Sequence, residues 1–177
     1  MNKSLKAVLA LVVLLAIGYL VMNLSGDKEE QPIAVSDYKN IEYVIEGKRV
    51  KLVDDARYFG NELRADLNGD SREDVVFLLT QQPGGTGTFF YVVAALNTEQ
   101  GYVGSDGYLL GDRIAPQTTE VSRNPKHKNV IVVNYADRAA DEPMTADPSV
   151  GKSAYLKLDP ATMQWGTVEA DFEGESR

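Results

Sequence analysis

The stretch that decides the fold reads Asp66-Leu67-Asn68-Gly69-Asp70-Ser71-Arg72-Glu73-Asp74 and runs directly into Val75-Val76-Phe77-Leu78-Leu79. Side-chain oxygens recur at loop positions 1, 3, 5 and 9, which are Asp66, Asn68, Asp70 and Asp74. Arg72 at position 7 can add its backbone carbonyl, and calcium prefers such a staggered set of hard oxygen ligands. The apolar run is typical of a strand buried on both faces. The sequence therefore predicts a cation-binding loop that leads into a central strand.

The loop resembles the calcium loops of FG-GAP/VCBS-type repeats in extracellular β proteins, and it is similar to dockerin-type loops. The resemblance covers roughly nine residues and implies one Ca²⁺ ion, held by Asp66, Asn68, Asp70, Arg72 and Asp74. It departs from an EF-hand, which needs glycine at position 6 and glutamate at position 12, because those positions are Ser71 and Phe77. A loop entering a strand fits better than a helix–loop–helix. Since Asp, Asn and Gly also build ordinary turns, a metal-free turn is the alternative.

Upstream of this stretch, residues 1–24 have the pattern of a membrane anchor. Ala7 to Met22 carries no charge and follows Lys3 and Lys6, and its length is near the lower limit for a spanning helix. No small-x-small cleavage pattern surrounds residues 23–26, so an uncleaved anchor is favoured over a removed signal peptide. The lysines predict a single-pass protein of the cell membrane with its main domain on the extracytoplasmic side. A buried core helix is the alternative.

The rest of the chain divides into a polar linker at 25–40, a β domain at 41–173 and a tail at 174–177. Strands are expected within 41–53 as a hairpin, at 75–80, 88–96, 129–135 and 152–158, and in a last hairpin at 163–168, with 58–63 and 113–121 extended. Few windows outside the anchor show helical periodicity. The predicted fold class is mainly β, a small antiparallel sandwich or strongly bent sheet behind an N-terminal transmembrane helix.

Composition limits the classes of partner. The 177 residues carry a formal net charge of -8, and phosphate backbones demand Lys and Arg, so a nucleic-acid partner is not expected. Cysteine is absent, which rules out a disulfide staple and makes a loop-bound ion a plausible substitute. A protein or glycan ligand is expected, and Tyr102, Tyr108, Tyr135 and Trp165 either line such a surface or belong to the core.

Candidate catalytic groups are few. His127, the single histidine, lies in a basic turn without an adjacent acid or nucleophile. Val150-Gly151-Lys152-Ser153 copies only the end of a P-loop and enters a strand. Asp137, Asp141, Glu142 and Asp147 form an acidic loop, which is either solvated, a second cation site or a carboxylate pair for glycoside hydrolysis. We therefore expect a membrane-anchored binding or cell-envelope module with one structural calcium. A glycosidase-like hydrolase that uses the 137–147 loop is the alternative.

Overall fold

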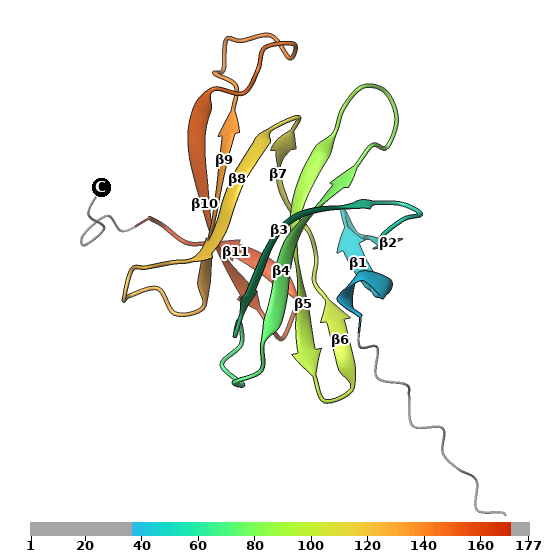
Figure 1. Cartoon of the computed structure of the whole chain (residues 1–177), viewed down its shortest axis with the longest axis vertical. Helices are drawn as coiled ribbons and strands as arrows, with labels where there is room; N and C mark the ends of the chain where they lie inside the picture. The colour runs from blue at the N-terminus through green and yellow to red at the C-terminus, as the bar shows by residue number, and fades with distance from the viewer. Residues whose placement is uncertain (1–36, 171–177) are drawn as a thin grey trace, which may run out of the picture. The chain divides into compact units, whose positions relative to one another are not determined.

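The computed structural model describes residues 37–170, which form antiparallel sheets preceded by one short 3-10 turn (Figure 1). In chain order the elements are η1 (Tyr38–Asn40), β1 (Glu42–Ile45), β2 (Lys48–Lys51), β3 (Arg57–Ala65), β4 (Asp74–Gln81), β5 (Phe89–Thr98), β6 (Gly101–Gly104), β7 (Tyr108–Asp112), β8 (Ala115–Val121), β9 (Val130–Asp137), β10 (Val150–Asp159) and β11 (Gln164–Thr167).

The central sheet runs in the order β3-β4-β5-β6, and β7 pairs with the first half of β5. Six consecutive residues of β4 and seven of β5 are buried, because both faces of this sheet are covered. Side chains alternate across a strand, so Val76 and Leu78 face one core while Phe77 and Leu79 face the other. The continuous apolar runs in the sequence follow from this double burial.

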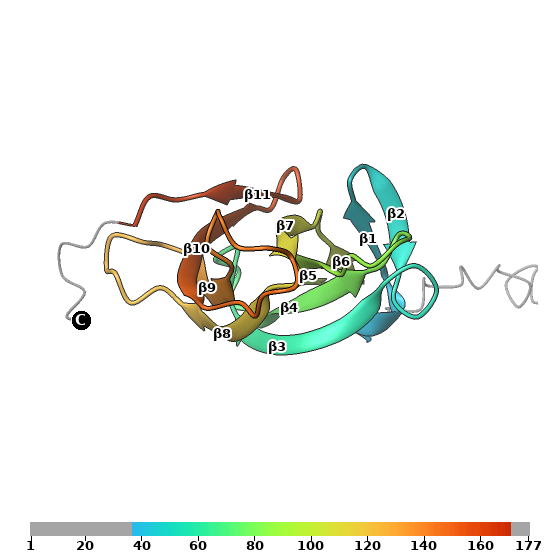
Figure 2. The same ribbon diagram turned by 90° about the horizontal axis from the view of Figure 1, so that it is seen from above.

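The first core lies between the central sheet and a second sheet in the order β11-β10-β9-β8. From this second sheet, Ile131, Val133, Leu156 and Leu158 are all nearly inaccessible to solvent. Figure 2 shows the second sheet on one side of the central sheet and the β1–β2 hairpin on the other. The arrangement is sandwich-like, with an additional two-stranded cover.

The β1–β2 hairpin covers the second core. Tyr43 packs edge-on against Phe77 with ring centroids 5.4 Å apart. β1 also crosses the sheet at the break between β6 and β7, where the Val44 amide donates to the Ser105 carbonyl at 3.2 Å. Glycine is required on either side of this crossing. A Cβ on Gly104 would come within 2.1 Å of a backbone oxygen, and one on Gly107 within 2.3 Å of the Ile45 side chain.

The structure confirms the mainly β class and the expected strands. The first hairpin is tighter than predicted, because Glu46 and Gly47 alone form its turn, with φ values of 51° and 77°. Those angles fit a two-residue I′ turn. The segment 101–111, whose five glycines predict loop with a short strand at 108–110, contains β6 and most of β7. The predicted anchor lies outside the described residues, and no helix within 37–170 has the length and apolar character to cross a membrane.

Candidate functional site

The predicted calcium loop connects β3 to β4. Ala65, the last residue of β3, pairs with Asp74, the first of β4, so the sheet ladder holds the two ends of the loop together. Gly69 and Ser71 adopt left-handed backbone conformations, with φ of 87° and 65°. These two positive φ values make the turn tight enough for its side chains to bond to its own amides.

Asp66 organises the loop from its first position. Its Oδ1 accepts hydrogen bonds from the amides of Gly69 at 2.6 Å, Asp70 at 3.2 Å and Asn68 at 3.3 Å. Its Oδ2 accepts from the Ser71 amide at 2.9 Å. The pKa of Asp66 is lowered, first by the Ser71 amide and next by the Gly69 amide, because these donors stabilise the ionised carboxylate.

Asp74 supports the loop from the protein interior. Its side chain is fully buried, with Oδ2 accepting from the Leu67 amide at 2.9 Å and Oδ1 from the Asn97 amide at 2.8 Å. Burial raises the pKa of Asp74, and the negative charges of Asp70 and Asp66 raise it further. Asp74 therefore joins the loop to the end of β5, although burying its negative charge near Asp66 and Asp70 is unfavourable.

Asp70 lies at the mouth of the loop, where the Arg72 side chain contacts it. Its Oδ2 accepts from Arg72 Nη2 at 2.7 Å and from Asn68 Nδ2 at 3.0 Å. The backbone amide of Arg72, 2.8 Å from Asp70 Oδ1, is the main cause of the lowered pKa of Asp70. Arg72 Nε also donates to the Asn97 carbonyl at 2.8 Å. The sequence interpretation used only the carbonyl of Arg72, and its side chain proves to be part of the site.

The residues fit a cation in part. Asp66, Asn68 and Asp70 lie together in one hydrogen-bond network. A carboxylate offers about four lone-pair positions, so Asp70, which accepts three hydrogen bonds, retains accepting capacity, whereas Asp66 already accepts four. Asp74 instead has both oxygens engaged by amides on the inner side. Within residues 37–170, no three or more His, Cys, Asp or Glu side chains are arranged as a ready metal cluster.

Two acids of the 137–147 loop, Asp137 and Glu142, accept hydrogen bonds from neighbouring groups. Asp137 ends β9 and accepts from Lys152 Nζ at 2.8 Å, a contact that lowers its pKa. Asp141, Glu142 and Asp147 are exposed, and Glu142 accepts from the Ala139 amide at 2.8 Å. The hydrogen bonds of Asp137 and Glu142 therefore stabilise the conformation of the loop itself.

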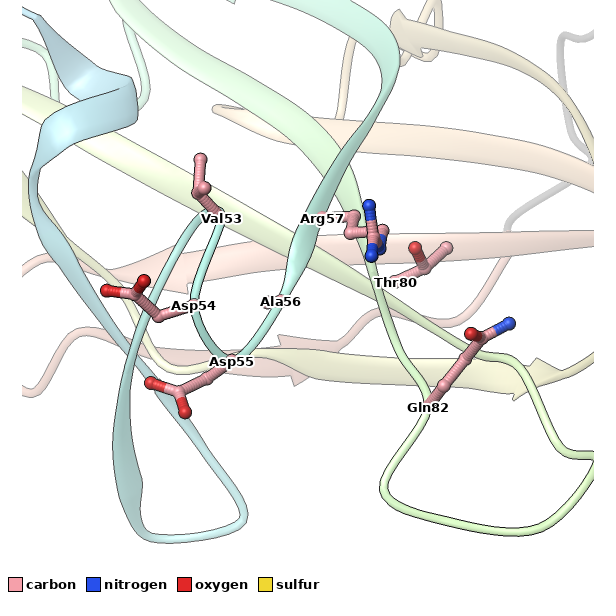
Figure 3. Close-up of a pocket in the computed structure, with 7 residues that line it drawn as sticks. All are labelled: Val53, Asp54, Asp55, Ala56, Arg57, Thr80 and Gln82. Atoms are coloured by element: carbon pink, nitrogen blue, oxygen red, sulfur yellow. The ribbon is translucent and has the colours of Figure 1, made fainter.

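Two surface pockets are of interest. The first, of about 170 Å³, lies where the Val53–Arg57 turn meets Thr80 and Gln82. Figure 3 shows Asp54 and Asp55 at one side of it and Arg57, Thr80 and Gln82 at the other. Val53 is 88% exposed and has φ of 87°, which is strained for a β-branched residue.

The second pocket, of about 430 Å³, we call the tyrosine groove. It is within the size range of ligand sites, and it is lined by Tyr108, Tyr135, Ser153, Ala154, Tyr155, Thr167, Val168 and Ala170. Of the aromatic residues singled out in the sequence, Tyr108 and Tyr135 come together here. Tyr102 packs on the hairpin side of the sheet and Trp165 against the other core. Tyr155 could have been anticipated from the strand alternation of 152–158.

His127 has a partner that sequence reasoning missed. Its Nδ1 lies 2.8 Å from Ser122 Oγ, and its ring packs edge-on against Tyr155 at 5.8 Å. The Asn124 amide also donates to Ser122 Oγ, at 3.3 Å. Within residues 37–170, no carboxylate forms a hydrogen bond with the imidazole, so the arrangement lacks the third member of a triad. The pair joins the two sides of the β8–β9 turn.

Comparison with known proteins identifies no relative: no protein-family model, no curated protein and no solved structure matches the chain. The function is therefore inferred from the residues of this chain alone.

Proposed function

We propose that this chain is a membrane-anchored, extracytoplasmic β domain that binds one structural calcium ion and acts as a binding or cell-envelope module. The charge-free run from Ala7 to Met22, preceded by two lysines, supports the anchor and its orientation. The β3–β4 loop supports the calcium.

The balance of charge in the loop is the observation that carries the calcium proposal. Asp66, Asp70 and Asp74 supply three negative charges, and Arg72 supplies one positive charge against Asp70. The sum of -3 and +1 is -2, which one divalent cation neutralises. The fourth acid, Glu73, contacts Arg64 at 3.4 Å, and Arg64 also pairs with Glu62 at 2.9 Å. Burial is the main cause of the raised pKa of Asp74, and the negative charges of Asp70 and Asp66 raise it further.

Calcium is expected at the mouth of the loop. Asp66, Asn68 and Asp70 provide side-chain oxygens there, and Arg72 provides its carbonyl, while Asp74 fixes the loop from below. Because position 12 is Phe77 and supplies no bidentate carboxylate, the affinity falls in the range of extracellular modules, on the order of 0.1–1 mM. Calcium at about one hundred times its dissociation constant then adds roughly 2.7 kcal/mol of stability.

The calcium proposal is tested by the melting temperature of the purified chain in calcium and in chelator. Calcium raises the melting temperature of the wild-type protein, and Asp70→Ala removes most of that shift. Asp159→Ala is the matched control. Asp159 also accepts a turn amide, from Ala161 at 2.9 Å, but it belongs to the β10–β11 turn. If the wild-type protein melts at the same temperature in calcium and in chelator, the loop is a metal-free turn and the calcium proposal is wrong.

The topology has its own experiment. Protease treatment of intact cells removes the β domain from the outside, and fractionation leaves the full-length chain in the membrane. A cytoplasmic full-length protein, or a secreted form beginning near Ser25, would refute the anchored arrangement.

A further inference from the structure

Part of the β10 edge has no neighbouring strand. β9 pairs with β10 from Val150 to Lys157, but β11 pairs only with the stretch from Leu156 to Asp159. Beyond that ladder, the Val168 amide donates to the Tyr155 carbonyl at 2.9 Å. Figure 1 shows β11 beside only part of β10. Among residues 37–170, no strand lies along the other side of Val150–Ala154.

The backbone groups on this open side are identified by alternation. The Tyr155 carbonyl and the Asp159 carbonyl both accept from the β11 side, the second from the Met163 amide at 2.8 Å. In an antiparallel strand, alternate residues direct their N–H and C=O groups to the same side. Gly151 and Ser153 therefore face the open side. Both residues are exposed, and a Cβ built on Gly151 would meet nothing within 4 Å.

The tyrosine groove lies at this same edge, since Ser153 and Ala154 line it together with Tyr108 and Tyr135. Tyr135 is directly opposite Lys152 in the β9–β10 ladder. A strand added beside β10 would carry alternate side chains toward these two tyrosine rings. An open edge with a pocket for alternate side chains is the arrangement by which domains bind extended peptides.

The surroundings of the edge are acidic. The loop that leads into β10 carries Asp141, Glu142 and Asp147, all exposed and without an ion pair among the described residues. The nearest positive groups are already engaged. Lys152 is paired with Asp137 at 2.8 Å, and Arg138 donates to the Ala146 carbonyl at 2.6 Å. A positively charged segment complements this end of the edge.

We propose that the open edge of β10 binds an extended, basic peptide segment of a partner protein by strand addition. The segment pairs with Gly151 and Ser153, places an apolar side chain in the tyrosine groove and directs a Lys or Arg toward the acidic loop. The inference rests on the proposed role as a binding module, but calcium takes no part in it. A glycan could stack on the tyrosines, yet it would not form the regular backbone hydrogen bonds that the N–H and C=O groups of Gly151 and Ser153 offer to a neighbouring strand.

The probe is a synthetic peptide, acetyl-Lys-Lys-Val-Thr-Val-Thr-Val-amide, added to the isotope-labelled full-length chain in detergent. Amide hydrogen exchange by NMR is the readout. The peptide slows exchange at Gly151 and Ser153 at least ten-fold. The same peptide with proline in place of its second valine does not slow exchange, because proline has no backbone N–H to donate to the neighbouring strand. A peptide with two glutamates in place of the lysines binds at least ten-fold more weakly.

Variants locate the site. Ser153→Pro removes the edge amide and lowers affinity at least ten-fold. Gly166→Ala on β11, where a Cβ would meet only the Lys157 carbonyl oxygen at 3.9 Å, is the control and retains binding. Asp147→Lys reverses a charge on the loop, so it weakens the lysine peptide and strengthens the glutamate peptide. This exchange of preference keeps the inference testable if Ser153→Pro fails to fold.

Several outcomes would overturn the inference. One is that the peptide leaves hydrogen exchange at the Gly151 and Ser153 amides unchanged. Another is that chitohexaose, but not the peptide, changes the chemical shifts of Tyr108 and Tyr135, which would make the groove a glycan site. Protection that grows with protein concentration would assign the edge to a second copy of the chain. Protection lost on deletion of residues 171–177 would assign it to the chain itself. If the melting temperature depends on calcium but the peptide does not bind, the peptide-binding inference is rejected and the calcium proposal stands.

Discussion

Replacing Asp74 by alanine removes the buried carboxylate that joins the loop to β5. Two amides, those of buried Leu67 and half-buried Asn97, lose their acceptor at 2.9 and 2.8 Å. A hydrogen bond to a charged group contributes about 1.5–3 kcal/mol, so the two together contribute about 3–6 kcal/mol. Relief of the buried charge offsets part of that loss, as the raised pKa indicates. We expect a net loss of about 3 kcal/mol, a large fraction of the stability of a typical domain.

The loss is measured by urea denaturation at pH 7 in chelator. With a slope of about 1.5 kcal/mol/M, a 3 kcal/mol loss lowers the midpoint by about 2 M at unchanged slope. Asp54→Ala is the matched control, because Asp54 is an exposed acid in the turn of Figure 3, and it shifts stability by less than about 0.5 kcal/mol. A loss below about 1 kcal/mol for Asp74→Ala would refute the view that this carboxylate holds the loop.

Three further changes follow from backbone geometry and from charge. Val53→Gly stabilises the domain by about 1 kcal/mol, because it relieves a β-branched residue at positive φ, and a higher melting temperature is the measure. Gly104→Ala places a methyl 2.1 Å from a carbonyl of β1 and lowers the melting temperature sharply, whereas Gly151→Ala leaves it unchanged. Asp66 and Asp70 have lowered folded pKa values, so the stability they add is present above the unfolded value of about 3.9 and is lost as the pH falls through the folded values. The melting temperature of the double Asn variant then depends less on pH below about pH 4.

Much of the fold was predictable because burial leaves a simple pattern. The runs Val75–Leu79 and Phe89–Leu96 are apolar without interruption, and such runs require cover on both faces. The strand at 101–104 was not predictable in this way, and of the strand at 108–112 only a short piece at 108–110 was expected. Their backbone is held by β5 and by the crossing of β1, so tertiary contacts override glycine's weak preference for strand.

The candidate site was predictable in its residues more than in their roles. Spacing alone brought Asp66, Asn68 and Asp70 to one loop, and the structure places them in one network. Spacing could not reveal that Asp74 points inward to two amides, because one of those amides belongs to Asn97, at the far end of the next hairpin. The Ser122–His127 contact depends in the same way on the path of the β8–β9 turn.

The contact of β1 with the segment between β6 and β7 has a consequence for the order of folding. Among the described strands, the hairpin at 42–51 is synthesised first, yet its docking site at Ser105 is completed about sixty residues later. Until then, one apolar face of β4 and β5 has no cover. Contacts of such long sequence separation form slowly, so docking of the hairpin is expected to be a late step. During that interval the uncovered apolar face of the newly made chain is exposed to aggregation.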